Sequence, residues 1–210
     1  MALALHLSPS KSIRPTKSSV KPVSRAAQMA RFKRHDLLPT RDNGFWRIES
    51  GYVRTFTWSH DGEAIPLGFW TTGDLVGQPI AQASPYEAQC LGPVTANYLG
   101  STYAFPQAAV LAQVRQSNEL LRIAHCRQTD LSLLQFLCWL AQRFGYPTKE
   151  GYEIPLKLIH RDIAESVGCT RVTISRLLKE LEREGHIRWS VYEKVVYKAT
   201  FSHYIRAIYS

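Results

Sequence analysis

The sequence lacks any long apolar run and any pattern of paired cysteines, and both absences narrow the possible functions. No segment approaches the roughly 20 apolar residues of a membrane-spanning helix, so we expect no membrane partner. The opening apolar stretch is short and follows no basic region, so we do not expect it to be a secretion signal. The four cysteines form no C-x-x-C pair and no zinc-ligand spacing. We therefore expect reduced thiols in a cytoplasmic protein, with no metal site and no iron–sulfur centre.

Acidic residues are missing from positions 1–35, and this absence explains the charge of the chain. The net charge is +9, and eight of the 26 lysines and arginines lie in this segment. The rest of the chain carries 18 basic and 17 acidic residues and is nearly neutral. The overall charge is therefore only weak support for nucleic-acid binding by the folded part of the protein.

The same segment, 1–35, is rich in serine, lysine, arginine and proline, a composition typical of disorder. Two other interpretations remain open. The segment could be a basic arm that adds salt-sensitive affinity for DNA, or an organelle transit peptide. The first of these supports an alternative function for the whole chain, non-specific nucleic-acid binding driven by its basic tail.

Residues 158–187 form the most informative pattern of the chain. An amphipathic helix is expected from about Ile159 to Val167, and Gly168 follows it as a C-terminal cap. Thr170 is suited to cap the N-terminus of a second helix, Arg171–Arg183. Two short helices joined by a tight glycine turn predict a helix-turn-helix, whose second helix enters the DNA major groove. The expected buried face of that helix comprises Val172 in part, Ile174, Leu177, Leu178 and Leu181.

The outer face of the second helix carries the residue types that read DNA. Arg171 and Arg176 can each donate two hydrogen bonds to guanine, and such pairs discriminate by about 1–3 kcal/mol. Val172 and Thr173 offer methyl groups to thymine. Phosphate contacts, which fix the register without reading sequence, are expected from His160, Arg161, Thr170, Ser175 and Lys179. The pattern therefore predicts sequence-specific binding to double-stranded DNA.

Upstream, residues 44–105 alternate short apolar runs with turns, which predicts a small antiparallel roll or barrel. Asp61 and Gly62 form a hairpin turn signal. The expected strands are Phe45–Ile48, Tyr52–Trp58, Ala64–Trp70, Leu75–Val76, Tyr86–Leu91 and Val94–Tyr98. The roll contains a single histidine, His60, and no H-x-H pattern, so a metal-dependent enzyme on a cupin-like roll is not expected, and neither is any other enzyme.

A helix is predicted from about Gln107 to His125, followed by a hinge at Cys126–Asp130 and a second helix, Leu131–Phe144. The first helix carries a stripe at alternating three- and four-residue spacing, formed by Leu111, Val114, Asn118, Leu121 and His125. This spacing predicts a parallel coiled coil with a second copy, in which Asn118 would fix the register. The alternative is that the stripe packs only on the roll of its own chain.

After the helix-turn-helix, Ile187–Ser190 and Lys194–Phe201 predict a β-hairpin wing. Lys194 and Lys198 on this wing could contact phosphate. The aromatic residues of the region are expected to pack rather than to stack on bases: Trp189, Tyr192, Tyr197 and Tyr204.

Residues 162–181 closely resemble the winged helix-turn-helix of the Crp–Fnr superfamily. Residues 135–145 resemble the hinge helix of cyanobacterial members, and residues 51–54, 61–63 and 73–77 resemble turns of the family's β-roll. The resemblance implies an α+β fold with an N-terminal antiparallel, cyclic-nucleotide-binding-like β-roll, a long dimerisation helix and a C-terminal winged helix-turn-helix. The implied boundaries are a tail at 1–35, the roll at 36–105, the dimerisation and hinge helices at 106–146, and the DNA-binding domain at 147–210.

The resemblance also implies a function. Family members bind palindromic sites as homodimers, so we expect a homodimeric transcription regulator of the nucleoid, acting as an activator that touches RNA polymerase. Arg171 and Arg176 match the two base-reading arginines of the family. The cyclic-AMP receptor has a glutamate at the position of Val172, and valine cannot accept from cytosine. The pattern of residues 171–176 instead resembles the nitrogen-control branch, which implies GTA…TAC half-sites.

Cyclic nucleotide binding is not expected. The cyclic-nucleotide members carry a glutamate after the roll's glycine and an Arg-Ser pair further on, where this chain has Gln78 and Tyr86-Glu87. No lysine or arginine occurs between Arg54 and Arg115, and a phosphate needs cations or converging amide donors. We therefore predict no cofactor, although Arg115 or Arg122 could contribute to a dicarboxylate site.

Overall fold

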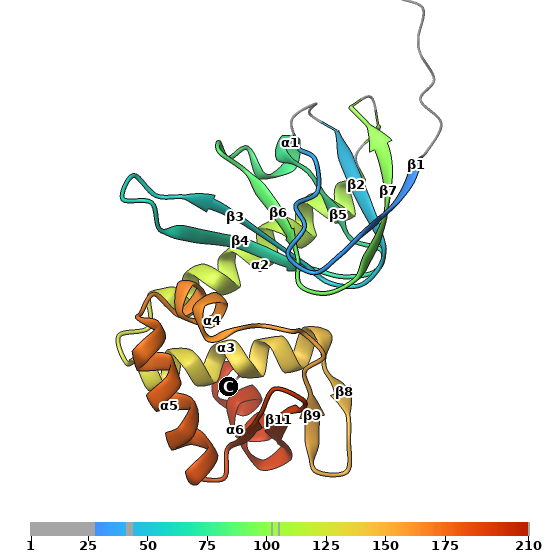
Figure 1. Cartoon of the computed structure of the whole chain (residues 1–210). Helices are drawn as coiled ribbons and strands as arrows, with labels where there is room; N and C mark the ends of the chain where they lie inside the picture. The colour runs from blue at the N-terminus through green and yellow to red at the C-terminus, as the bar shows by residue number, and fades with distance from the viewer. Residues whose placement is uncertain (1–27, 41–43, 102, 105, 210) are drawn as a thin grey trace, which may run out of the picture.

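The computed structural model describes residues 28–40, 44–101, 103–104 and 106–209 (Figure 1). A β-roll lies at one end of the molecule and a helical domain with a small sheet at the other, and the long helix α2 runs between them (Figure 1). The fold is therefore the predicted α+β arrangement of an antiparallel roll, a long helix and a winged helix-turn-helix.

Two antiparallel sheets form the roll, with strand orders β1-β7-β2-β5 and β4-β3-β6. The strands predicted from the sequence are all present, within two residues at each end. Their bounds are β2 Phe45–Ser50, β3 Val53–Trp58, β4 Ala64–Trp70, β5 Leu75–Val76, β6 Glu87–Cys90 and β7 Val94–Gly100, and the short helix α1 spans Gln78–Ala81. Gly62, with φ at +78°, lies in the predicted turn between β3 and β4.

Strand β1, Gln28–Phe32, corrects the expectation of disorder over residues 1–35. It pairs with β7 through all five of its residues. The ring of Phe32 packs edge-on against Trp46 with 5.4 Å between centroids, which gives the strand an apolar anchor. The disordered tail was thus predicted too long by residues 28–35, and residues 1–27 lie outside the described part of the chain.

The helical domain begins with α2, Gln107–Ala124, and α3, Thr129–Phe144, both close to their predicted bounds. The helix-turn-helix consists of α4, His160–Val167, and α5, Arg171–Arg183. The remaining elements are β8 Tyr146–Pro147, β9 Gly151–Glu153, β10 Ile187–Trp189, β11 Lys194–Tyr197 and α6 Lys198–Tyr209. The four strands form one sheet in the order β10-β11-β9-β8, so the wing is wider than the predicted hairpin.

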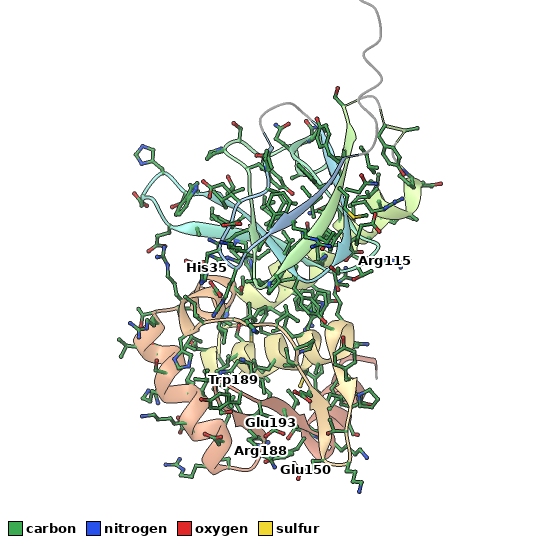
Figure 2. All side chains as sticks on the ribbon, turned by 45° about the vertical axis from the view of Figure 1, so that its right-hand side comes forward. His35, Arg115, Glu150, Arg188, Trp189 and Glu193 are labelled. Atoms are coloured by element: carbon green, nitrogen blue, oxygen red, sulfur yellow. The ribbon has the colours of Figure 1, made fainter. Side chains whose placement is uncertain are left out.

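The second wing strand was predicted to reach Phe201, and this boundary is wrong. The chain turns into α6 at Lys198, because α6 has its own apolar partners. The ring of Phe201 lies 4.2 Å from that of Tyr152 on β9, and Tyr204 is buried. On the wing sheet, Arg188 lies between Glu150 and Glu193 and pairs with both (Figure 2).

One apolar core joins the two halves of the molecule. Phe69 of β4 packs against both Phe136 and Trp139 of α3, with ring centroids 5.8 and 6.0 Å away. This core continues through α4 and α5 into the wing, while the roll has a second core of its own. The roll therefore packs directly on the helices that carry the helix-turn-helix.

A buried ionic group fixes α4 to the roll. The Nη1 atom of Arg54 on β3 lies 2.7 Å from Asp162 and 2.8 Å from Glu165. Its Nε atom donates to Gln89 at 2.9 Å. Asp162 also accepts from the backbone N–H of Ile159 at 2.9 Å and so caps the start of α4. Burial raises the pKa of Asp162, and the Arg54 cation opposes this shift.

Replacing Arg54 by methionine should leave the buried Asp162 carboxylate without its cation and beside Glu165, which keeps its pair with Arg161. Removing one partner of a buried ion pair costs about 3–5 kcal/mol, so we expect the free energy of unfolding to fall by an amount of this order. Urea unfolding at neutral pH measures it. The control Arg47→Met removes an exposed pair with Glu49 and should cost no more than about 1 kcal/mol.

The loss of unfolding free energy in Arg54→Met should become smaller as the pH falls. Without Arg54 the pKa of Asp162 rises further above its unfolded value, so the folded variant binds more protons than the unfolded chain. Its stability then increases as the pH falls from neutral towards the unfolded pKa of about 4. The unfolding free energies of the variant and the wild type should therefore differ less at about pH 4 than at neutral pH. If this difference stays constant over that range, the role given to Asp162 is wrong.

Candidate nucleic-acid interface

The turn between α4 and α5 has the geometry that the sequence predicts. Gly168 adopts φ of +75°, a left-handed conformation that favours glycine, and its N–H donates to Ala164 at 2.9 Å. The Thr170 hydroxyl accepts from the N–H of Thr173 at 3.2 Å and caps α5. The predicted start and end of α5 are confirmed.

Apolar residues on one side of α5 are buried, and these are the expected Ile174, Leu177, Leu178 and Leu181. Val172 differs from the prediction that it would be partly buried, because it is 78% exposed. It lies in the first turn of α5, where the outer face already points away from α4. The valine methyl groups are therefore open to a partner.

Arg171 and Arg176 both lie on the exposed side of α5. The Nη1 atom of Arg176 is 3.2 Å from Glu180, one turn further along the same helix, and the Arg176 side chain stays 68% exposed. Thr173 is half-buried, with its hydroxyl 3.0 Å from that of Thr170. The helix thus presents two guanidinium groups and one exposed valine on a surface supported by its own core.

Four of the five predicted phosphate contacts have partners within the protein, and the fifth, Lys179, is exposed. Nδ1 of His160 lies 2.8 Å from the Ser175 hydroxyl, which also donates to the Arg171 carbonyl, so these groups brace the two helices. Burial and then the nearby Arg171 cation lower the pKa of His160. Arg161 is exposed but pairs with Glu165 at 2.8 Å. Thr170 serves as the helix cap, and Lys179 is exposed.

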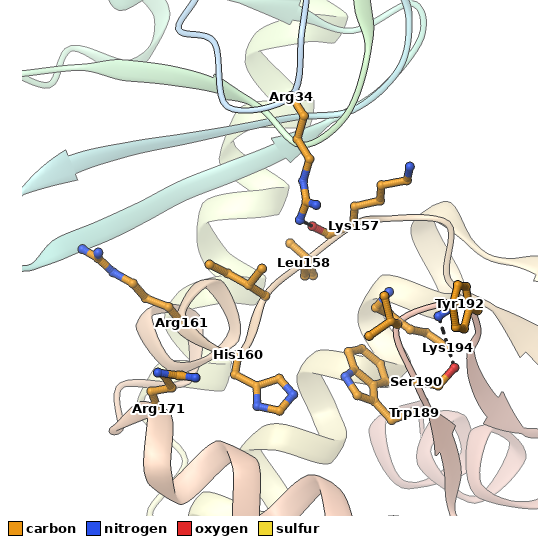
Figure 3. Close-up of a pocket in the computed structure, with 12 residues that line it drawn as sticks. Arg34, Lys157, Leu158, His160, Arg161, Arg171, Trp189, Ser190, Tyr192 and Lys194 are labelled. Carbon is orange, nitrogen blue, oxygen red and sulfur yellow. Dashed lines mark hydrogen bonds between the residues drawn. The ribbon is translucent and has the colours of Figure 1, made fainter.

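A cleft of about 840 Å³ lies between the start of the helix-turn-helix and the wing (Figure 3). Besides His160, Arg161 and Arg171, it is lined by basic residues from segments that the motif does not include, Arg34 and Lys157. Sequence reasoning missed both. Lys157 could have been found from its position just before α4, whereas Arg34 is brought here only by the folding of the roll onto the strap 154–159, as Figure 3 shows.

The tip of the wing is open. Tyr192 is 96% exposed, so the expectation that it would pack is wrong, and its neighbour Val191 is also exposed. The two residues occupy the turn between β10 and β11, where no other described element covers them. Trp189, in contrast, is half-buried and lies beside the Lys194 ammonium group.

Helix α2 has two faces with different environments. Gln116, Leu120 and Ile123 are buried against the roll and α3. The predicted stripe is on the opposite side and is exposed along its length, at Leu111, Val114, Asn118, Leu121 and His125. Leu121 is 59% exposed. The alternative that this stripe packs on the roll of its own chain does not hold.

The residues that the sequence analysis compared with cyclic-nucleotide members have protein partners in the roll. Glu87 accepts from the Trp58 indole N–H at 2.9 Å. Tyr86 is buried, and burial raises its pKa. Arg122 of α2 is 2.8 Å from Glu119 and donates to the Tyr204 hydroxyl at 3.0 Å, which turns it away from the roll.

Within the described residues, no group of three or more histidine, cysteine or acidic side chains could hold a metal ion. A search of the same part of the chain finds no helix with the length and apolarity to cross a bilayer.

Comparison with known proteins agrees with this geometry. Residues 133–197 match the family model described as a Crp-like helix-turn-helix domain. The chain is 38% identical over 157 residues to the regulatory protein CysR of Synechococcus elongatus, covering 73% of this chain and 76% of that protein. It is 40% identical over 76 residues to the global nitrogen regulator of Synechocystis, covering 36% and 33%.

Solved structures show the same fold. A CRP-family transcriptional regulator from Thermus thermophilus superposes with a TM-score of 0.68 at 22% identity, covering 86% of this chain and 97% of that one. FixK2 from Bradyrhizobium japonicum gives 0.68 at 16% identity, covering 85% and 96%. The named relatives are transcription regulators rather than enzymes. The chain belongs to the Crp–Fnr family of helix-turn-helix transcription regulators and resembles its cyanobacterial members.

Proposed function

We propose that this regulator acts as a homodimer on a palindromic promoter site and activates transcription through contact with RNA polymerase. The observation that carries the proposal is the exposed pair Arg171 and Arg176 on a helix whose other side is buried. A recognition helix of this kind reads base edges in the major groove. Such a protein would work in the cytoplasm, on the nucleoid.

Base reading follows from the groups on the outer face of α5. The two guanidinium groups suit guanine O6 and N7, and the exposed methyl groups of Val172 suit a thymine. Residues 171–176 resemble the recognition helix of the nitrogen-control branch, and this resemblance implies GTA…TAC half-sites. Relatives of this chain include proteins named global nitrogen regulators. We propose this half-site for the chain and no role in nitrogen control.

Dimerisation is supported by the exposed stripe on α2. Leu111, Val114 and Leu121 are each between 47% and 59% exposed, and they share one side of an 18-residue helix. A mainly apolar stripe with heptad spacing is suited to pair with its own copy. Two copies joined in parallel would place two α5 helices on successive turns of the duplex, which is why the site should be palindromic.

Arg176→Ala should flatten the base preference at one position of each half-site. The loss of a bidentate contact costs about 1–3 kcal/mol against the preferred base and little against the others. Selection of binding sites from a random duplex pool, followed by footprinting, measures both effects. The control Lys179→Gln should weaken binding evenly across sequences, because a phosphate contact carries no base information.

The alternative of tail-driven binding gives a different result. It would coat any duplex, protect no two-fold-symmetric site and be insensitive to Arg176. That outcome would overturn the proposal and favour non-specific binding through the basic N-terminal segment.

Leu121→Lys should convert the dimer into a monomer. The substitution puts a cation from each copy into the apolar seam, where like charges repel. Sedimentation equilibrium of the variant should report a single chain, and its affinity for the palindrome should fall while the fold is retained. Ile65→Lys, an apolar residue of β4 that is 46% exposed, is the matched control and should leave the mass unchanged. A dimer that survives Leu121→Lys would exclude α2 as its seam.

For the roll, we propose that it responds to no cyclic nucleotide. The support is the carboxylate of Glu87 in place of a cation and the absence of lysine and arginine from residues 55–114. Titration of the protein with cyclic AMP in a calorimeter should give no binding heat. Micromolar binding would show that the nucleotide is held by other groups.

A further inference from the structure

The cleft between the strap before α4 and the wing gathers cations without counter-ions. Five of its lining residues are lysine or arginine: Arg34, Lys157, Arg161, Arg171 and Lys194. Among the described residues that line it there is no aspartate or glutamate. Arg161 has its own carboxylate partner, Glu165, which leaves the other four facing the cleft without one.

Lys194 is the unusual member of this group. It is only 8% exposed, and its ammonium group lies 5.7 Å from the Trp189 ring without a carboxylate in range. Burial lowers its pKa first, and the charges of Arg34 and Lys157 lower it further. The one acid beside it in sequence, Glu193, is paired with Arg188 at 3.0 Å (Figure 2).

A buried ammonium group among other cations is unfavourable in the free protein and becomes favourable once an anion is bound. A contact with the strap positions Arg34 at the cleft. The guanidinium of Arg34 donates to the backbone carbonyl of Lys157 at 3.0 Å, which holds the strap against the roll (Figure 3).

We propose that Lys194, Lys157 and Arg34 form a seat for one oxyanion, and that its occupant is a backbone phosphate of the bound duplex. The proposal deepens the proposed function and rests on it for the identity of the occupant. It adds to the DNA-binding surface a residue of the roll, Arg34, and a residue buried in the wing, Lys194, neither of which belongs to the helix-turn-helix.

The position of the cleft favours a DNA phosphate. One side is formed by His160 and Arg171, at the starts of α4 and α5. The other side is formed by the wing, whose tip residues Val191 and Tyr192 are exposed. A duplex whose major groove receives α5 would therefore bring one strand's backbone over this cleft. Because Arg34 belongs to the roll, the seat is complete only while the roll stays docked on the strap.

Lys194→Met tests the seat, because methionine keeps the length of the side chain and removes its charge. We expect the free protein to melt at a higher temperature in low salt, since repulsion and the buried charge are gone. We expect duplex affinity to fall by at least about tenfold, the usual effect of losing a charged hydrogen bond. The slope of log K against log salt should become shallower by about 0.9.

A charge-matched control is Lys149→Met at the exposed β8–β9 turn, which should change none of the three quantities: melting temperature, duplex affinity and salt slope. Arg34→Gln should also lower the affinity for duplex DNA, as Lys194→Met does. In both variants the base preference selected from a random pool should stay that of the wild type. If Lys194→Met lowers the melting temperature and leaves affinity and salt slope unchanged, the lysine is a structural residue and the seat is refuted.

Inorganic phosphate separates the seat from the proposed function. Millimolar phosphate should raise the melting temperature of the wild type more than that of Lys194→Met, whether or not the protein selects a DNA sequence. A phosphate effect with no preferred duplex would retain the seat and refute the proposed function. A phosphate effect that the preferred duplex does not displace would refute DNA as the occupant, and equal effects on both proteins would refute the seat itself.

Discussion

The placement of the helix-turn-helix depends on how the charge of Arg54 is shared between two carboxylates. A buried carboxylate is tolerated only when it is paired or protonated, and Asp162 and Glu165 lie on the side of α4 that faces the roll. Asp162 has a second task, because it also caps the first turn of α4. One carboxylate therefore acts at both places: its Oδ2 atom caps the start of α4, and its Oδ1 atom pairs with Arg54 on the roll. Since α5 is packed on α4, the direction of its outer face follows from this contact.

Helix α2 connects the roll and α3 with the proposed dimer interface. Its buried side, Gln116, Leu120 and Ile123, is committed to the roll and to α3, whereas its exposed stripe is free for a second copy. The Phe69 ring on β4 enters the core that α3 shares with α4 and α5. A shift of the roll would thus reach both the proposed dimer seam and the recognition helix through direct packing. This coupling needs no long pathway, because one apolar core spans all the elements involved.

Local sequence patterns were sufficient to predict the elements whose ends are determined by residues within or next to them. The limits of α5 followed from Gly168 and Thr170, and the roll strands followed from alternation and turns. Strand β1 and helix α6 could not be found in this way, since each is stabilised by partners distant in sequence, Trp46 for Phe32 and Tyr152 for Phe201. The helix-turn-helix residues carry a local motif that predicts their contacts, but no local pattern predicts what Arg34 and Arg54 contact. Their roles arise only when the roll folds onto the helical domain.

The proposed DNA-binding surface differs from the rest of the molecule in how its charges are paired, more than in its net charge. Outside the N-terminal segment the chain is almost neutral, yet its acids are distributed unevenly. Those of α4 are used by Arg54 and Arg161, and those of the wing are used by Arg188. Four cations without a carboxylate partner among the described residues, Arg34, Lys157, Arg171 and Lys194, lie along the cleft, where their mutual repulsion disfavours the free protein and a bound phosphate would relieve it. A nearly neutral domain can in this way concentrate its affinity for an anion at one site, without the diffuse attraction of a strongly basic surface.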